Sequence, residues 1–253
     1  MLLAFAWRSQ HRESVEKNFE ELDYQNSVLG ELILRRRKIP MLENAIVHEV
    51  ILNGEFLMSS LFHAAEDALA DLGIAACTER SLDIVIGGLG LGYTAVAALA
   101  YPKVRSITVV EMLEPVIRWH HAGLLPVGTQ VADDDRVHFV QGDFFTLATG
   151  DRGFDPVTSD QQYHAILLDI DHTPTHWLHP RNAGFYSKDG LRKLTKYLLP
   201  SGIFAMWSDG AADAAFLNLL REIFAHTDAH TITFPNPIQM RESSSTIYVA
   251  RRA

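Results

Sequence analysis

Acidic residues recur at the ends of the hydrophobic, strand-like segments in the second half of the chain. They are Glu111, Asp143, Asp169, Asp171 and Asp209. A single Asp in a loop usually closes a turn or caps a helix. Ligands of parallel sheets, however, bind at the carboxyl ends of the strands, where such acids would meet. A binding site lined by acids at this edge of the sheet suits a cationic ligand, such as a sulfonium or an amine. It also supplies a carboxylate that can accept a proton.

A glycine-rich loop precedes the first of these acids, and its glycines are Gly87, Gly88, Gly90 and Gly92. Glycines permit a tight turn and bring backbone N–H groups close to a ligand at the start of a helix. Glu111 stands about 20 residues further on, where nucleotide-binding folds place the acid that binds ribose hydroxyls. We therefore expect residues 82–111 to form a strand, loop, helix and strand that hold the adenosine half of a nucleotide-like cofactor.

A nicotinamide dinucleotide is the alternative ligand, because residues 90–95 also satisfy the pattern G-x-G-x-x-A. Three features disfavour it. Gly88, Gly90 and Gly92 also have the tighter spacing G-x-G-x-G. The dinucleotide-binding fold lacks the antiparallel hairpin that we expect at the C-terminus. Acids after the third and fourth strands would repel a pyrophosphate. The pattern therefore favours a sulfonium nucleoside.

Strands and helices alternate regularly after residue 80. Hydrophobic patterning predicts strands at residues 83–86, 106–111, 137–141, 164–169, 202–207, 230–234 and 246–250. It predicts helices at residues 93–100, 114–122, 189–199 and 212–226, with a short one near 144–148. Such alternation gives a parallel sheet covered on both faces. The last two strands are joined only through residues 235–237, so the final strand should run antiparallel.

Residues 1–80 lack this alternation. The patterning predicts a polar helix at 11–22, strands at 27–34 and 46–52, and a helix at 56–72. We therefore expect two parts: an N-terminal β-rich segment with a helix, residues 1–80, and an α/β domain of Rossmann-like type, residues 81–253.

The composition indicates which kinds of binding partner and which cellular compartment to expect. The net charge is −9, and a protein that binds duplex nucleic acid usually presents a basic surface. Cys77 is the single cysteine, which fits a reducing compartment. The apolar residues 1–7 are too few to span a bilayer, which needs about 20. We therefore expect a cytoplasmic protein that binds neither nucleic acid nor membrane.

The segment between Asp169 and Tyr186 is long for a connection in an α/β fold, where about 2–6 residues is usual. We expect it to close over the site as a lid, with Trp177 or Tyr186 facing a sulfonium. Its histidines suggest a zinc site, but its prolines prevent a regular helical face and no cysteine joins them. We therefore expect no metal there.

Several stretches carry a resemblance to a known family. They are residues 85–92, 109–111, 141–143 and 163–169, with Tyr24-Gln25 and Glu55-Phe56 earlier in the chain. From about Ala45 onward the chain resembles the spermidine synthase-like proteins of the S-adenosylmethionine-dependent methyltransferase superfamily. The resemblance implies a Rossmann-like, seven-stranded methyltransferase-type sheet with a terminal antiparallel hairpin, plus a small N-terminal β-rich domain. It also implies a homodimer.

The resemblance assigns roles to individual residues. The cofactor-binding set would be Gln25, Gly87, Gly88, Gly90, Gly92, Glu111, Gly142 and Asp143. Within it, Glu111 would hold the ribose hydroxyls and Asp143 would accept from the adenine amino group. Asp169, with Asp171 as a second acid, would be the catalytic carboxylate. The co-substrate would be decarboxylated S-adenosylmethionine or S-adenosylmethionine, the acceptor a small-molecule amine, and the enzyme an aminopropyltransferase.

Three departures from the family pattern leave alternatives open. Gly90 stands where the family has an Asp that holds the donor's aminopropyl amine. Asp169 and Asp171 are spaced more closely than the family's Asp-x-x-Asp-Pro, and Met58-Ser59 replaces a Tyr-Gln pair. A methyltransferase is therefore a second hypothesis, with a magnesium-dependent variant in which Asp169 and Asp209 are oxygen ligands. A non-catalytic protein that binds adenosyl nucleosides is the third.

Overall fold

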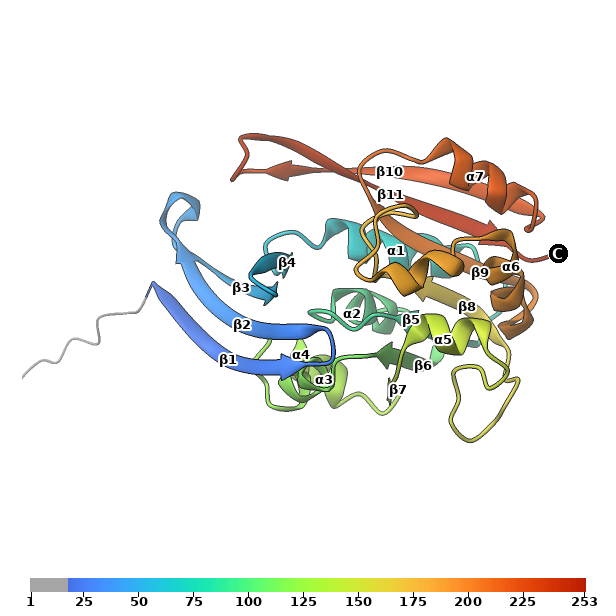
Figure 1. Cartoon of the computed structure of the whole chain (residues 1–253), viewed down its shortest axis with the longest axis horizontal. Coiled ribbons are helices and arrows are strands. Elements are labelled where there is room, and N and C mark those ends of the chain that lie inside the picture. Colours follow the sequence, from blue (N-terminus) through green and yellow to red (C-terminus); the bar gives the residue numbers. More distant parts are fainter. Residues whose placement is uncertain (1–17) are drawn as a thin grey trace, which may run out of the picture.

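The computed structural model describes residues 18–253 and contains two β-sheets (Figure 1). A four-stranded antiparallel sheet carries the N-terminal part. A seven-stranded mixed sheet, with helices on both faces, carries the rest. The small sheet lies beside the end of the large one that bears the glycine loop, so both contribute to one cavity.

The small sheet has the order β1-β2-β3-β4. Its strands are β1 (Phe19–Ser27), β2 (Gly30–Ile39), β3 (Ala45–Leu52) and β4 (Glu55–Ser59), with a 3-10 turn at Pro40–Leu42. The buried carboxylate of Glu49 on β3 accepts hydrogen bonds from Arg35 and Arg37 on β2, both at 2.8 Å. Paired charges thus tie the two central strands together.

Three sequence-based expectations for this region need correction. Part of the predicted helix at 11–22 lies outside the described residues, and Phe19–Leu22 is strand β1. The predicted strand at 27–34 contains the β1–β2 turn. The predicted helix at 56–72 is split: Glu55–Ser59 pairs with β3, and helix α1 runs from Ala64 to Ala75. Cross-strand pairing with β3 outweighs the helical pattern there.

The large sheet has the order β10-β11-β9-β8-β5-β6-β7. Its strands are β5 (Leu82–Gly87), β6 (Val104–Glu111), β7 (Val137–Gln141), β8 (Tyr163–Leu168), β9 (Leu198–Asp209), β10 (His226–Asn236) and β11 (Arg241–Arg251). Strands β5 to β9 are parallel to one another. Strand β11 of the β10–β11 hairpin pairs with β9 in the antiparallel direction. The expected α/β fold and its terminal hairpin are confirmed. β5 lies between β6 and β8, which makes its carboxyl end the switch point of the sheet.

Helices and two hydrophobic clusters cover the faces of this sheet. The helices are α1, α2 (Tyr93–Leu99), α3 (Glu114–His121), α4 (Gly128–Ala132), α5 (Phe144–Thr149), α6 (Lys188–Leu194) and α7 (Ala214–Arg221), with 3-10 turns at Pro180–Gly184 and Thr195–Tyr197. One cluster includes Leu69, Ile86 and Trp119. The other includes Phe144, Tyr186 and Phe216. Each face of the sheet therefore has its own core.

Helix α1 packs against the large sheet although it follows the small one in sequence. It contacts β8, β9 and β11 as well as α2. A Cβ atom on Gly73 would lie 2.5 Å from Leu167 Cδ2 and 3.3 Å from Ala205 Cβ, so a larger residue there would have to displace the Leu167 side chain. The packing brings the first turn of α1 to the carboxyl ends of the strands. No helix within residues 18–253 combines the length and apolar character needed to cross a bilayer.

Candidate functional site

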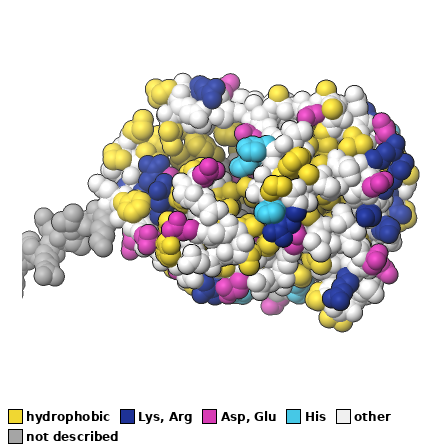
Figure 2. All heavy atoms as spheres, viewed as in Figure 1, with side chains coloured by type: hydrophobic (Ala, Val, Ile, Leu, Met, Phe, Trp, Pro, Cys, Tyr) yellow, Lys and Arg dark blue, Asp and Glu magenta, His cyan; other side chains and the backbone are white. Residues whose placement is uncertain are grey.

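A cavity of about 290 Å³ opens at the carboxyl end of β5. Its walls come from the glycine loop, the ends of β6 and β8, strands β3 and β4, and the start of α1. Figure 2 shows a hollow lined by hydrophobic side chains, with acidic and histidine side chains at its edge. Seven of the ten expected site residues line the cavity: Gly88, Gly90, Gly92, Glu111, Gly142, Asp143 and Asp169.

The glycine loop passes so close to the end of β8 that side chains are excluded. Gly88 has φ +93°, and a Cβ atom there would lie 2.1 Å from the backbone oxygen of Asp169. Gly92 has φ +95° at the start of α2, and its Cβ would lie 2.8 Å from His120 Nε2. Left-handed backbone and close contact together require glycine at these two positions.

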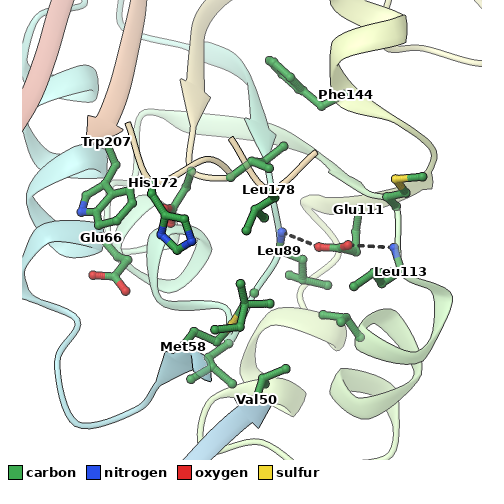
Figure 3. Close-up of a pocket in the computed structure, with 18 of the residues that line it drawn as sticks. Val50, Met58, Glu66, Leu89, Glu111, Leu113, Phe144, His172, Leu178 and Trp207 are labelled. Atoms are coloured by element: carbon green, nitrogen blue, oxygen red, sulfur yellow. Dashed lines mark hydrogen bonds between the residues drawn. The ribbon is translucent and has the colours of Figure 1, made fainter. Parts of the chain in front are cut away.

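Glu111 is the last residue of β6, and its carboxylate is fixed by backbone donors. Oε2 accepts from the N–H of Leu89 at 3.0 Å, and Oε1 accepts from the N–H of Leu113 at 2.8 Å (Figure 3). Burial raises the pKa of Glu111, and these backbone hydrogen bonds oppose the rise. Backbone hydrogen bonds from Gly90 and Met112 also oppose it, so backbone donors of the glycine loop and of the turn after β6 hold this carboxylate at the cavity wall.

Asp143 is the N-cap of α5. Its carboxylate accepts from the N–H of Phe145 at 3.1 Å and from the hydroxyl of Thr146 at 2.8 Å. Asp143 lines the cavity beside Leu113 and Phe144, whose apolar side chains form part of the same wall. A flat ring with a polar edge suits such a wall, because most of its surface is apolar and the carboxylate can accept from one donor.

Asp169 follows β8 and is the expected catalytic carboxylate. Its Oδ2 accepts a hydrogen bond of 2.9 Å from the hydroxyl of Thr94, in the first turn of α2. Its backbone N–H donates to the carbonyl of Gly87 at 2.8 Å, which extends the pairing between β8 and β5. Burial raises the pKa of Asp169 to about 6, and the Thr94 hydrogen bond opposes the rise. The group can therefore exchange a proton near neutral pH.

Glu66 is a cavity residue that the sequence-based reasoning missed. It stands in the first turn of α1 and lines the cavity together with Asp169. Burial, and then the negative charge of Asp169, raise the pKa of Glu66 to about 8. A signal was present in the sequence: Glu66 lies three, four and seven residues before the buried Leu69, Ala70 and Gly73. An acid on the buried face of a helix indicates a special environment.

Aromatic side chains line the cavity around Glu66. They include Phe62, Trp207 and Phe234, and the rings of Phe62 and Phe234 are 5.8 Å apart. The indole nitrogen of Trp207 is buried and makes no hydrogen bond to any described residue. In the view of Figure 3, Glu66, Trp207 and His172 occupy one end of the cavity, and Glu111 and Leu113 occupy the other. The cavity therefore has two chemically different ends.

Gln25 and Gly87, two of the three remaining site residues, support the structure outside the cavity lining. Gln25 donates to Asp23 at 2.9 Å, and Asp23 also accepts from the indole N–H of Trp119 at 2.6 Å, which ties β1 to α3. A Cβ on Gly87 would lie 2.5 Å from a ring carbon of Phe144, so Gly87 makes room for that ring.

Asp171, the third, anchors the loop that follows β8. It is 3% exposed and accepts from the N–H of Leu178 at 2.7 Å, from Asn182 Nδ2 at 2.9 Å and from the hydroxyl of Tyr186 at 2.9 Å. Burial raises the pKa of Asp171, and these hydrogen bonds oppose the rise. The buried carboxylate of Asp171 thus fixes the conformation of the loop that follows β8 through hydrogen bonds to three residues of that loop.

The expectation that Trp177 or Tyr186 faces a sulfonium is wrong in this conformation. The indole N–H of Trp177 donates to the carbonyl of Pro174 at 2.8 Å, and Tyr186 is turned to Asp171. Neither side chain lines the cavity. The loop instead contributes His172, Leu178, His179, Arg181 and Asn182 to the wall.

Potential metal ligands do not converge within residues 18–253. The rings of His172 and His176 are 4.9 Å apart, but no group of three His, Cys, Asp or Glu side chains is arranged to hold an ion in this part of the chain. Asp209 is exposed and does not line the cavity that contains Asp169. The arrangement needed for the magnesium-dependent hypothesis is therefore not assembled here.

Two of the departures from the family pattern lie against each other. A Cβ atom on Gly90 would be 3.3 Å from the sulfur of Met58, so an Asp at position 90 would contact that side chain. Around them the wall is apolar and includes Val50, Leu57 and Leu91. Positions 58 and 90, for which the spermidine synthase-like pattern has a Tyr and an Asp, thus form one apolar contact in the cavity wall.

Comparison with solved structures gives the fold of the chain. No family model matches the sequence. A spermidine synthase from Thermotoga maritima matches with a TM-score of 0.68 and 14% identity, covering 92% of this chain and 72% of that one. A spermidine synthase in complex with the transition-state analogue AdoDATO matches with a TM-score of 0.69 and 15% identity, covering 92% and 74%.

A third match is a probable spermidine synthase from Corynebacterium glutamicum. Its TM-score is 0.59 and its identity 16%, and the match covers 92% of this chain and 79% of that one. At these identities the likeness concerns the arrangement of elements. The small antiparallel sheet and the seven-stranded sheet agree with the expected resemblance, so the chain has a spermidine synthase-like fold.

Proposed function

We propose that the protein binds an adenosyl sulfonium compound in the cavity and transfers an aminopropyl or related alkyl group from it to an amine. The observation that carries this proposal is the placement of Asp169. Its half-buried carboxylate is held by Thr94 and lines the same cavity as the glycine loop and Glu111. A carboxylate there can take the proton of an incoming ammonium and leave a neutral nitrogen that can attack carbon.

The nucleoside end of the cavity supports the donor class. Glu111 places a fixed carboxylate in the cavity lining, where it can accept from ribose hydroxyls, and Asp143 offers an acceptor next to the ring of Phe144. A decarboxylated S-adenosylmethionine-type donor is favoured because structurally similar proteins are spermidine synthases, one of them bound to the transition-state analogue AdoDATO. When bound, such a donor supplies a carbon activated by a positive sulfur. The chain's residues position it and accept the proton of the amine.

Methyl transfer from intact S-adenosylmethionine is the second candidate, and two observations favour it. Gly90 and Met58 provide no acid where the family pattern places one for the aminopropyl ammonium. Arg181 lines the cavity, and its guanidinium can pair with the carboxylate that only the intact donor carries. The two candidates share the nucleoside site and differ in the tail of the donor.

Product analysis separates these candidates. The protein is incubated with either donor and a panel of linear amines, and mass spectrometry identifies aminopropyl or methyl adducts. We expect aminopropyl adducts from the decarboxylated donor, and methyl adducts from the intact donor would favour the second candidate. Absence of any adduct from both donors would contradict the proposal. We expect turnover to be unchanged when a chelator is added. Loss of turnover on chelation would favour metal-dependent methyl transfer.

Asp169→Asn should lower turnover by about 100-fold or more, because general-base assistance contributes at least that much. Asp209→Asn is the matched control: it makes the same change at the end of the next strand, in an exposed residue outside the cavity lining. Full turnover by the Asp169→Asn variant would show that the carboxylate is not the proton acceptor.

A further inference from the structure

We propose that His120 is a positioning residue for the glycine loop, and that the loop holds an adenosyl compound only while the His120 ring is neutral. The inference rests on the proposed function, because it concerns how the chain prepares the nucleoside end of the cavity. His120 belongs to α3 and does not line the cavity, and the resemblance implies no role for it.

The contact between His120 and Gly92 is the first argument. The His120 side chain is fully buried against the start of α2. A Cβ atom on Gly92 would lie 2.8 Å from His120 Nε2, and 3.3 Å from a methyl carbon of Val127 and of Val131. The last glycine of the loop is therefore seated directly against the ring nitrogen, so the ring sets how closely the loop can approach α3.

The start of α3 gives the second argument, because it fixes the carboxylate proposed to bind ribose. The backbone N–H of Leu113, the N-cap of α3, donates to Glu111 at 2.8 Å, and the N–H of Leu89 in the glycine loop donates to the other oxygen at 3.0 Å. The loop thus meets α3 twice, through Glu111 at the start of the helix and through His120 in its last turn. A shift of the loop at His120 should therefore disturb the hydrogen bonds that hold Glu111.

The two ring nitrogens of His120 are in different situations. Nδ1 lies 2.9 Å from the carbonyl oxygen of Val116, which can only accept, so Nδ1 carries the N–H of the neutral ring. Nε2 then keeps a bare lone pair. It is buried and has no hydrogen-bond partner among the described residues. Such unpaired atoms are rare in folded proteins, so the nitrogen that lies against the loop is a special feature of this contact.

A second proton on the ring would turn Nε2 into a donor. Burial lowers the pKa of His120, and the charge of His121 adds to this effect, whereas the backbone of Val116 and of Leu91 favours the protonated ring. A protonated Nε2 would therefore take the Leu91 carbonyl as its acceptor and draw the loop toward α3. Protonation of His120 and binding of the nucleoside thus oppose each other.

Other charged groups around α3 are engaged elsewhere. The glycine loop and residues 122–132 contain no charged side chain. The charged or titratable side chains of the neighbouring elements have other surroundings: Asp23 on β1 accepts from Trp119, Arg105 on β6 pairs with Asp83, Glu111 is held by backbone donors, Glu114 and Arg118 on α3 pair with each other, and His138 on β7 is exposed. Within residues 18–253, His121 is therefore the one side chain whose charge acts on His120.

Nitrogen-15 NMR of the imidazole rings tests the inference in the full chain. The protein is titrated from pH 8 to pH 5, free and saturated with methylthioadenosine, and the signal is assigned with His120→Phe, or with His120→Asn if that variant does not fold. We expect saturation to lower the pKa of His120 by about one unit or more, which means at least tenfold tighter binding to the neutral ring. His121, the exposed neighbour on the same helix, is the matched control and should keep its pKa.

Calorimetry supplies a second readout. The affinity for methylthioadenosine is measured at pH 7.5 and pH 5.5, where Glu111 and Asp169 can also contribute to the difference. We expect a smaller loss of affinity at the lower pH in His120→Phe than in the wild-type protein, and the wild-type loss in His121→Phe. Thermal unfolding of each variant checks folding.

The outcomes are distinct. If methylthioadenosine binds but leaves the pKa of His120 unchanged, or if the ring stays neutral down to pH 5 with and without the nucleoside, the inference is overturned while the proposed function stands. If methylthioadenosine does not bind to the wild-type protein, the proposed function fails and the inference fails with it.

Discussion

The hydroxyl of Thr94, in the first turn of α2, donates a hydrogen bond of 2.9 Å to the carboxylate of Asp169 at the end of β8. This contact joins the helix that follows the glycine loop to the proposed proton acceptor. It favours the ionised form of Asp169, whose pKa burial raises to about 6. A small change at Thr94 should therefore alter the pH dependence of the reaction without altering the shape of the nucleoside site.

Thr94→Val should shift the acid limb of the pH–rate profile to higher pH. Asp169 must be ionised to accept a proton, so turnover should rise with pH through about 6 in the wild-type protein. Removal of the hydrogen bond should raise this pKa by about one unit, which corresponds to about 1.4 kcal/mol. Thr94→Ser keeps the hydroxyl and should keep the limb in place. An unchanged limb in Thr94→Val would mean that another group controls it.

Glu66→Gln should stabilise the fold above pH 5, and increasingly so up to pH 8. The pKa of Glu66 is about 8 in the folded protein and 4.5 as its ordinary value, so the folded state holds a proton that the unfolded state has lost. Between these pH values the wild-type protein loses stability as pH rises. At pH 8 the variant should gain more than about 1.4 kcal/mol, the free energy of one pKa unit. Chemical denaturation at pH 5, 6.5 and 8 measures this, and a gain that does not depend on pH would contradict it.

Gly88→Ala should abolish adenosyl binding and destabilise the protein, because the new Cβ would lie 2.1 Å from the Asp169 carbonyl. Gly54→Ala is the matched control. Gly54 also has a positive φ, +79°, but a Cβ there meets nothing within 4 Å. The control should lose only about 1–2 kcal/mol to backbone strain. Equal losses in unfolding free energy for the two variants would show that the close approach of the loop to β8 is unimportant.

Tyr186→Phe should destabilise the protein by roughly 1.5–3 kcal/mol, because it removes a donor to the buried carboxylate of Asp171. Tyr101→Phe makes the same change at an exposed pair with Asp71 and should cost under about 1 kcal/mol. Denaturant unfolding measures both. If Tyr186→Phe leaves stability unchanged while Asp171→Asn abolishes turnover in a folded protein, Asp171 acts in catalysis and not as the anchor of the loop.

The sequence was sufficient for the elements whose signals are local. The strand, loop, helix and strand from Leu82 to Glu111 were predicted because glycine spacing and hydrophobic runs are read directly from neighbouring residues. The terminal hairpin was predicted because residues 235–237 leave no room for a crossover helix. The regular alternation of strands and helices placed Glu111, Asp143 and Asp169 at the carboxyl ends of successive strands, and these three residues line one cavity.

The remaining parts depend on contacts between distant residues. Residues 55–59 have a helical pattern but pair with β3 as a strand. Asp171 resembles a second catalytic acid in sequence, yet the fold turns it inward to Tyr186 and Asn182. Glu66 stands in the first turn of a helix, where acids are common, and only the packing of α1 on β8 and β9 brings it to the cavity that Asp169 lines. No spacing rule connects positions that far apart.

The central claim is that the cavity binds an adenosyl sulfonium compound through Glu111. Calorimetry with methylthioadenosine, S-adenosylmethionine and decarboxylated S-adenosylmethionine tests it most directly, in the wild-type protein and in Glu111→Gln. We expect one site per chain, tightest binding of the decarboxylated donor, and at least tenfold weaker binding of all three compounds by the variant. Absence of binding in the wild-type protein, or equal affinity in Glu111→Gln, would contradict the account.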